Sequence, residues 1–121
     1  MSPDEVQALV EDATFDYING DSETALAKLA RATSEQSDSF EAWHAVAEVN
    51  LGLRRLDPAL AAAEKAHALN KADPMVIATL SRIWMEKGDK ARAEHYGAAA
   101  RVENWKTELK APNSNSARDL R

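Results

Sequence analysis

A repeat of 34 residues constrains this chain more than any other feature of its sequence. Residues 40–73 and 74–106 share one pattern of small and apolar residues at this spacing, and residues before 40 follow it more weakly. Two alanine positions recur in all three units, as Ala25, Ala59 and Ala93 and as Ala32, Ala66 and Ala100. A period of this length indicates stacked supersecondary units, each of which buries its apolar face only against its neighbours.

Capping residues, prolines and glycines divide the repeats into helices joined by short turns. Ser2-Pro3 and Asp73-Pro74 each place a capping side chain before a proline at the first helical position. Gly20 and Gly88 are expected to end helices, since glycine adopts the left-handed conformation without a steric penalty.

In the second unit Gly52 is expected to weaken the last turn of the helix, and the turn is expected over residues 53–56. We align Arg54–Asp57 with Glu86–Asp89, and we expect Asp57 to cap the fourth helix with Pro58 at its first position. The pattern as a whole predicts an all-α fold of six helices in three antiparallel hairpins, with no strands.

The charge distribution and composition of the chain limit the kinds of partner that we expect it to bind. The formal net charge is −5 over 121 residues, but residues 1–39 carry nine acids against two bases and residues 74–121 carry six acids against nine bases. An acidic first third argues against nucleic acid as a partner. Cysteine is absent, the first residues do not resemble a secretory signal, and no apolar run is long enough to span a membrane. The expected location is therefore the cytoplasm, with no membrane partner.

The repeat residues resemble those of the tetratricopeptide repeat (TPR) family. The third unit carries the resemblance best, with Leu80-Ser81, the aromatic Trp84, the turn at Gly88 and the two small packing positions. The resemblance implies a right-handed α–α superhelix, with repeats at about residues 6–39, 40–73 and 74–107 in a single domain of residues 3–111. We expect Trp43 and Trp84 to lie in the core, and residues 112–121 to form a disordered tail.

The first unit departs from the family pattern, with Asp12 and Asp16 at positions that are apolar in the family. Two explanations stay open. An end repeat needs a polar outer face, and a partner could also bind there.

In stacked helical hairpins the first helix of each pair lines the concave side. Helical rotation then predicts a groove for a peptide or a partner helix, with methionines that adapt to irregular apolar partners. The groove residues are Gln7, Val10, Thr14, Tyr17, Glu41, His44, Glu48, Leu51, Met75, Arg82 and Met85. The sequence thus favours a non-enzymatic scaffold that binds a protein or peptide.

One known TPR activity is not expected. Co-chaperones of the family grip a C-terminal carboxylate with lysines, asparagines and an arginine. The matching positions here are neither basic nor amide residues: Val10, Thr14, Ala45, Met75 and Thr79. The resemblance therefore does not extend to a carboxylate clamp.

Enzymatic and cofactor chemistry have no signature in this sequence. The three histidines, His44, His67 and His95, are too far apart in sequence to form a helical metal pair, and zinc needs three or four ligands. Phosphate-binding loops and nucleophile motifs are also absent. We expect no catalytic residues, no metal and no cofactor.

The alternative function is self-assembly through the ends of the repeat stack. Trp105 follows the last repeat, with Val102 and Leu109 each about one helical turn away. These three residues could cover the exposed end of the superhelix or form a contact in a homo-oligomer.

Overall fold

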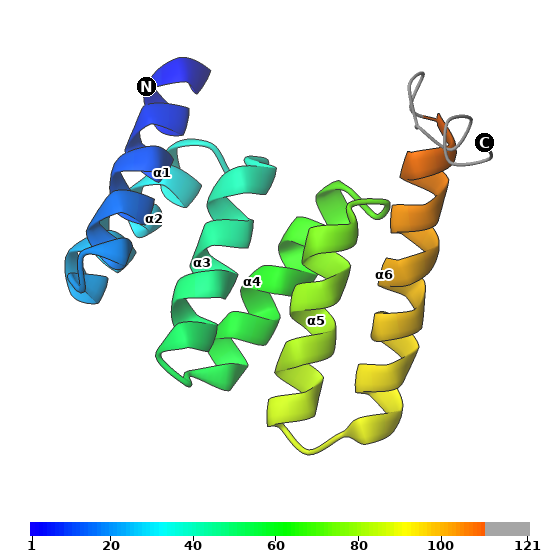
Figure 1. Cartoon of the computed structure of the whole chain (residues 1–121). Helices are drawn as coiled ribbons and strands as arrows, with labels where there is room; N and C mark the ends of the chain where they lie inside the picture. The colour runs from blue at the N-terminus through cyan, green and yellow to red at the C-terminus, as the bar shows by residue number, and fades with distance from the viewer. Residues whose placement is uncertain (111–121) are drawn as a thin grey trace.

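The computed structural model describes residues 1–110, so the expected tail at 112–121 lies outside the described residues. These residues form six helices and no strand. The helices are α1 (Pro3–Ile18), α2 (Ser22–Glu35), α3 (Phe40–Gly52), α4 (Leu56–Leu69), α5 (Pro74–Glu86) and α6 (Lys90–Lys110). The predicted all-α superhelix is confirmed, as three hairpins follow one another from the N-terminus to the C-terminal end of α6 (Figure 1).

Four of the helices begin at a side-chain cap, and the sequence predicts the caps at Ser2 and Asp73. Ser2 and Glu5 form a reciprocal capping box at the start of α1. The side chains of Asp21, Ser39 and Asp73 accept backbone hydrogen bonds at the starts of α2, α3 and α5. Each cap satisfies amide groups that have no partner inside the helix.

The turn inside each hairpin uses one left-handed residue at the same repeat position. Gly20 has φ 88°, Arg54 has φ 64° and Gly88 has φ 87°, and these residues are 34 positions apart. Our alignment of Arg54–Asp57 with Glu86–Asp89 was therefore wrong by two residues, because Arg54, and not Leu56, is the equivalent of Gly88. An arginine in this conformation carries a cost that glycine avoids.

The start of α4 was also predicted wrongly. The helix begins at Leu56, its N-cap Arg55 provides no side-chain hydrogen bond, and Pro58 is the third helical residue. Proline is tolerated there because the first amides of a helix have no acceptor in the helix. The Asp57 carboxylate lies 2.6 Å from Lys87 Nζ and so connects the second repeat to the third.

Two apolar clusters share α3, which contributes opposite faces to them. The first joins α1, α2 and α3 through Val6, Val10, Ala13, Ala25, Leu29, Ala32, Ala42 and Val49. The second joins α3, α4 and α5 through Ala47, Ala59, Ala62, Ala63, Ala66, Val76, Leu80 and Ile83. Alanine dominates the second cluster, so helix backbones approach closely and the few large side chains fill most of the remaining space.

Trp43 is half-buried and packs against the second cluster, whereas Trp84 is half-buried and packs against neither cluster, contrary to our expectation for it. Trp43 Nε1 donates to the Ser37 carbonyl, and the ring lies under Lys65 Nζ at 4.8 Å. Arg92 covers the Trp84 ring in the same way at 4.6 Å. Cationic side chains stabilise such partly exposed rings.

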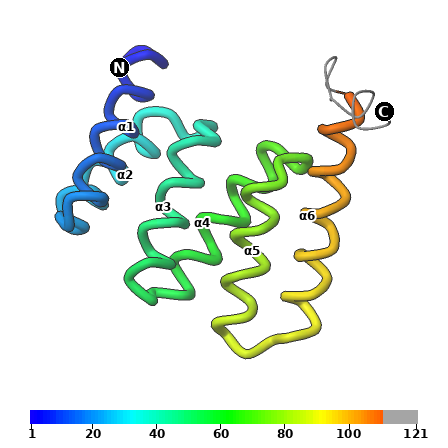
Figure 2. Tube along the Cα trace, viewed as in Figure 1, coloured from blue at the N-terminus to red at the C-terminus, as the bar shows by residue number. Residues whose placement is uncertain are grey.

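The helices α1, α3 and α5 form one layer of the superhelix. Close backbone contacts link α1 to α3 and α3 to α5, whereas α2, α4 and α6 make none with one another within residues 1–110. The hairpins thus contact one another more closely through their first helices than through their second helices, and Figure 2 shows them following one another along the chain. Within the same residues, no helix is both long and apolar enough to cross a membrane.

Candidate functional site

Two adjoining pockets run along the layer of first helices and share the side chains of Tyr17 and Glu48. One, of about 410 Å³, lies between α1 and α3. The other, of about 370 Å³, lies between α3 and α5, with Tyr17 of α1 at its edge. Each volume is within the range of small ligand sites and can hold several side chains of a partner. Together the pockets form a continuous groove.

The pocket between α1 and α3 is apolar at its base and acidic at its edges, and we call it the acidic pocket. Its lining contains three carboxylates and neither lysine nor arginine. The rings of Phe40 and His44 lie 5.9 Å apart in its wall. The lining residues are Gln7, Val10, Glu11, Thr14, Tyr17, Phe40, Glu41, His44, Ala45, Glu48 and Val49.

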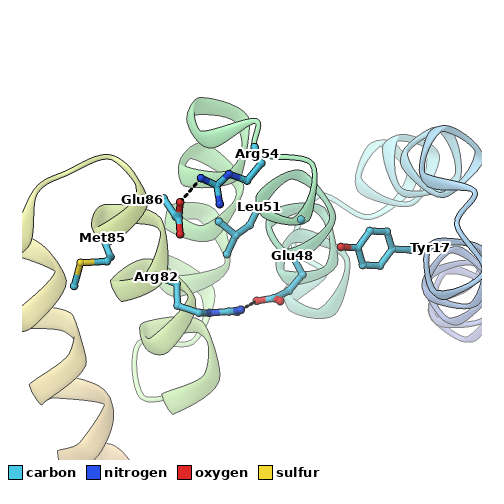
Figure 3. A pocket seen from close by; sticks show the side chains of 8 residues that line it. Tyr17, Glu48, Leu51, Arg54, Arg82, Met85 and Glu86 are labelled. Carbon is cyan, nitrogen blue, oxygen red and sulfur yellow. Dashed lines mark hydrogen bonds and ion pairs between the residues drawn. The ribbon is translucent and has the colours of Figure 1, made fainter.

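The pocket between α3 and α5 carries charges that neutralise one another, and we call it the paired pocket (Figure 3). Arg82 Nη2 lies 2.6 Å from Glu48 Oε2, and Arg54 Nη2 lies 2.6 Å from Glu86 Oε1. The lining residues are Tyr17, Glu48, Leu51, Gly52, Arg54, Arg82, Met85 and Glu86. A ligand here meets ion pairs rather than an excess of one charge.

Tyr17 separates the two pockets and depends on a glycine in the facing helix. A Cβ at Gly52 would lie 1.8 Å from the Tyr17 hydroxyl oxygen, so any other residue at 52 would displace the ring. Glycine has a low helix propensity, but Gly52 is the last residue of α3. Because Gly52 has no side chain, the Tyr17 phenol packs directly on the α3 backbone.

Glu48 is the polar centre of the groove. Its Oε2 atom accepts from Thr79 Oγ1 at 2.5 Å and from Arg82 at 2.6 Å, and it lies 3.5 Å from His44 Nε2. Thr79 is only 1% exposed, and its hydroxyl lies within hydrogen-bond distance of both the Glu48 carboxylate and the Met75 carbonyl oxygen. Hydrogen bonds from His44 first, and then from Thr79 and Arg82, outweigh burial and lower the pKa of Glu48 from 4.5 to about 2.

The Glu48→Gln variant should therefore lose stability that depends on pH. The pKa of Glu48 is lower in the folded state than in the unfolded chain, so its contribution is fully present above pH 4.5 and is lost as the pH falls towards 2. Because the side chain is 37% exposed, solvent screening limits this contribution to about 1–2 kcal/mol. Urea unfolding at several pH values measures it.

Glu41→Gln is the matched control, because Glu41 is exposed on the same helix. Its free energy of unfolding should differ from that of the wild type by no more than about 0.5 kcal/mol at pH 7, as expected for an exposed position. A gap between Glu48→Gln and the wild type that stays constant from pH 7 to pH 2 would contradict the assigned role of the Glu48 charge.

The structure places almost all of the predicted groove residues in the walls of these two pockets. Met75 is the exception, since it is 67% exposed and lies in neither lining. Whether the groove binds a peptide remains a prediction. Sequence reasoning missed Glu11, Phe40, Ala45, Val49, Gly52, Arg54 and Glu86, most of which lie one or three positions from a predicted lining residue. A wider angular window around each helix face would have included them, except for Arg54, which lies in the turn between α3 and α4.

Two acidic residues of the first repeat, Asp12 and Asp16, belong to an ion-pair cluster outside these pockets. Lys28 Nζ of α2 lies 2.6 Å from the Asp16 carboxylate and 3.6 Å from that of Asp12. Both contacts link the two helices of the first hairpin.

The residues proposed for self-association lie on α6, away from both pockets. Val102, Trp105 and Leu109 are 47%, 61% and 64% exposed. They do not contribute to either pocket lining.

No protein-family model matches the sequence, and no curated protein matches it. Among solved structures, it superposes on the Yersinia enterocolitica type III secretion translocator chaperone SycD (alternative dimer) with a TM-score of 0.80 and 16% identity. That match covers 98% of this chain and 87% of the other. A chain of the CopN–Scc3 complex matches with a TM-score of 0.80 and 13% identity, covering 99% of this chain and 68% of the other.

The fold is a TPR-like helical repeat. At these identities the likeness concerns the path of the backbone and carries no side-chain role from one protein to the other. The chemistry of the groove therefore rests on the residues described above.

Proposed function

We propose that this chain is a non-enzymatic scaffold that binds a segment of a partner protein in the groove lined by α1, α3 and α5. The observation that carries the proposal is the pair of adjoining pockets, which share Tyr17 and Glu48 and extend over all three repeats. A groove of this length suits an extended peptide or one face of a helix better than a small molecule. The structural neighbours, a secretion chaperone and a chain of a protein complex, agree with a protein-binding role.

The charge of the groove indicates which segment fits. The acidic pocket combines an apolar base with Glu11 and Glu41, and neither residue has an ion-pair partner among residues 1–110. A partner with an apolar side chain next to lysine or arginine would bury the apolar group and bring its cation close to these carboxylates. An acidic peptide would meet repulsion there. The same lining gives no support for a carboxylate clamp, which needs basic residues.

A displayed library of random peptides, selected against the full chain, tests this proposal. Enriched peptides should contain leucine, methionine or an aromatic residue close to lysine or arginine. Replacing both Glu11 and Glu41 by glutamine should weaken the enriched peptides by about fivefold at low salt, and less at high salt, because exposed charge pairs contribute modestly and are screened.

Glu64→Gln on α4 is the control, since Glu64 is exposed and lies in neither pocket lining. It should leave peptide affinity unchanged. Selection of acidic peptides, or an equal loss of affinity in the control, would exclude the acidic pocket as the site for basic segments.

A further inference from the structure

The last helix exposes an apolar stripe along its outer face. Its members recur at alternating spacings of three and four residues, which is the heptad spacing of a coiled-coil seam. All of them are exposed, and the large ones are the most exposed apolar side chains of the helix. The stripe consists of His95, Ala98, Val102, Trp105 and Leu109.

This stripe lies opposite the face through which α6 packs on α5. Ala93 and Ala100 are buried on the inner face, and at 100° per residue their mean direction is about 180° from that of the stripe. A helix that is apolar on two opposite faces is normally buried on both. Within the described residues only the inner face of α6 is covered.

We propose that the stripe pairs with the same stripe of a second copy of this chain, with the two α6 helices antiparallel. In this arrangement Val102 of each copy packs against Trp105 of the other, and Ala98 packs against Leu109. At each end of the contact the small side chain of Ala98 thus faces the large side chain of Leu109, which lets the two helices pack closely.

Charges beside the stripe favour this arrangement. Arg101 and Glu108 occupy equivalent heptad positions next to the seam, and neither has an ion-pair partner among residues 1–110. In the antiparallel pair, Arg101 of each copy lies across from Glu108 of the other, so two attractive pairs form by symmetry.

The competing arrangements bring like charges together. A parallel pair places Arg101 across from Lys106 of the second copy, twice. An antiparallel pair shifted by seven residues places Arg101 across from its own counterpart and Glu94 across from Glu108. Charged residues that flank a helical seam select orientation and register in this way.

The proposed contact is isologous, and it therefore closes at two copies instead of extending into a fibre. Its area is limited to about three turns of one helix, so the dimer should be weak, in the micromolar range or above. The contact does not involve the groove, and the proposal is independent of the proposed function.

Charge exchange in the full chain tests the proposal by sedimentation velocity over micromolar to millimolar concentrations. The wild type should form dimers. Arg101→Glu and Glu108→Arg should each weaken the dimer about tenfold, because each turns two attractive pairs into repulsive ones. The variant that carries both changes should restore the wild-type dimer. Trp105→Gln should abolish it, and circular dichroism should show unchanged folding since Trp105 is exposed.

The chain has no cysteine, so introduced thiols report the register directly. Ala98→Cys alone should not cross-link in the antiparallel pair, because the two thiols are about 16 Å apart along the seam. Adding Leu109→Cys should produce a cross-linked dimer. A monomer at every concentration overturns the proposal and points to another occupant of the stripe, such as residues 111–121. A dimer that Arg101→Glu strengthens, or that the double exchange fails to restore, overturns the antiparallel register.

Discussion

Leu80→Ala is expected to lower the free energy of unfolding by about 2–5 kcal/mol. Leu80 is 1% exposed and packs in the second cluster among alanines of α4. The helix backbones around it already approach closely, so they cannot move inwards to fill the cavity that the substitution leaves. Because a domain of this size is stable by only about 5–15 kcal/mol, this one change can remove a large part of its stability.

Urea denaturation followed by circular dichroism measures this loss. Met75→Ala is the matched control on the same helix, because Met75 is 67% exposed, and it should change stability by no more than about 0.5 kcal/mol. A loss of less than about 1 kcal/mol in Leu80→Ala would mean that the cluster repacks, which its alanine content argues against.

Thr14→Trp should weaken a peptide selected against the full chain by about a hundredfold, which corresponds to about 2.7 kcal/mol. Thr14 lies at the edge of the acidic pocket and is exposed, so the larger side chain can turn into the pocket without entering the core. The indole would then occupy the space into which the apolar side chain of the partner packs. Fluorescence anisotropy with a labelled peptide measures the affinity.

The control places the same side chain outside the groove. Ala61 is exposed on α4 and lines neither pocket, so Ala61→Trp should bind the peptide as the wild type does. Both variants should melt at the wild-type temperature. Unchanged peptide affinity in a folded Thr14→Trp variant would place the binding site elsewhere and would falsify the groove proposal.

The helices were predictable because their signals are local. Ser2, Ser39 and Asp73 cap the helices that follow them, and Gly20 and Gly88 take the left-handed turn conformation that glycine favours. The turn of the second hairpin was predicted wrongly because Arg54 takes the left-handed conformation although it is not a glycine. Asp57 resembled a cap from sequence alone, whereas its carboxylate instead contacts Lys87, which is 30 residues away.

The groove was predictable only as a helix face. Rotation along α1, α3 and α5 identified which side chains point to the concave side, but periodicity within one helix does not reveal pairing between helices. The Glu48 contacts with Thr79 and Arg82 join positions 31 and 34 residues apart. The position of Met75 outside both pockets similarly depends on how α5 is placed against α3.

Polar links between repeats are distributed unevenly, and this affects how the groove can deform. Five link the second repeat to the third: His44–Thr79, Glu48–Thr79, Glu48–Arg82, Arg54–Glu86 and Asp57–Lys87. Within residues 1–110, Arg55–Glu23 is the ion pair that links the first repeat to the second. Relative rotation of the second and third hairpins must break several of these contacts, whereas the first hairpin can rotate mainly by sliding on apolar surface. From these polar contacts we expect the superhelix to resist rotation more at the paired pocket than at the acidic pocket, where the groove has fewer such contacts to break when it widens around a bulky side chain.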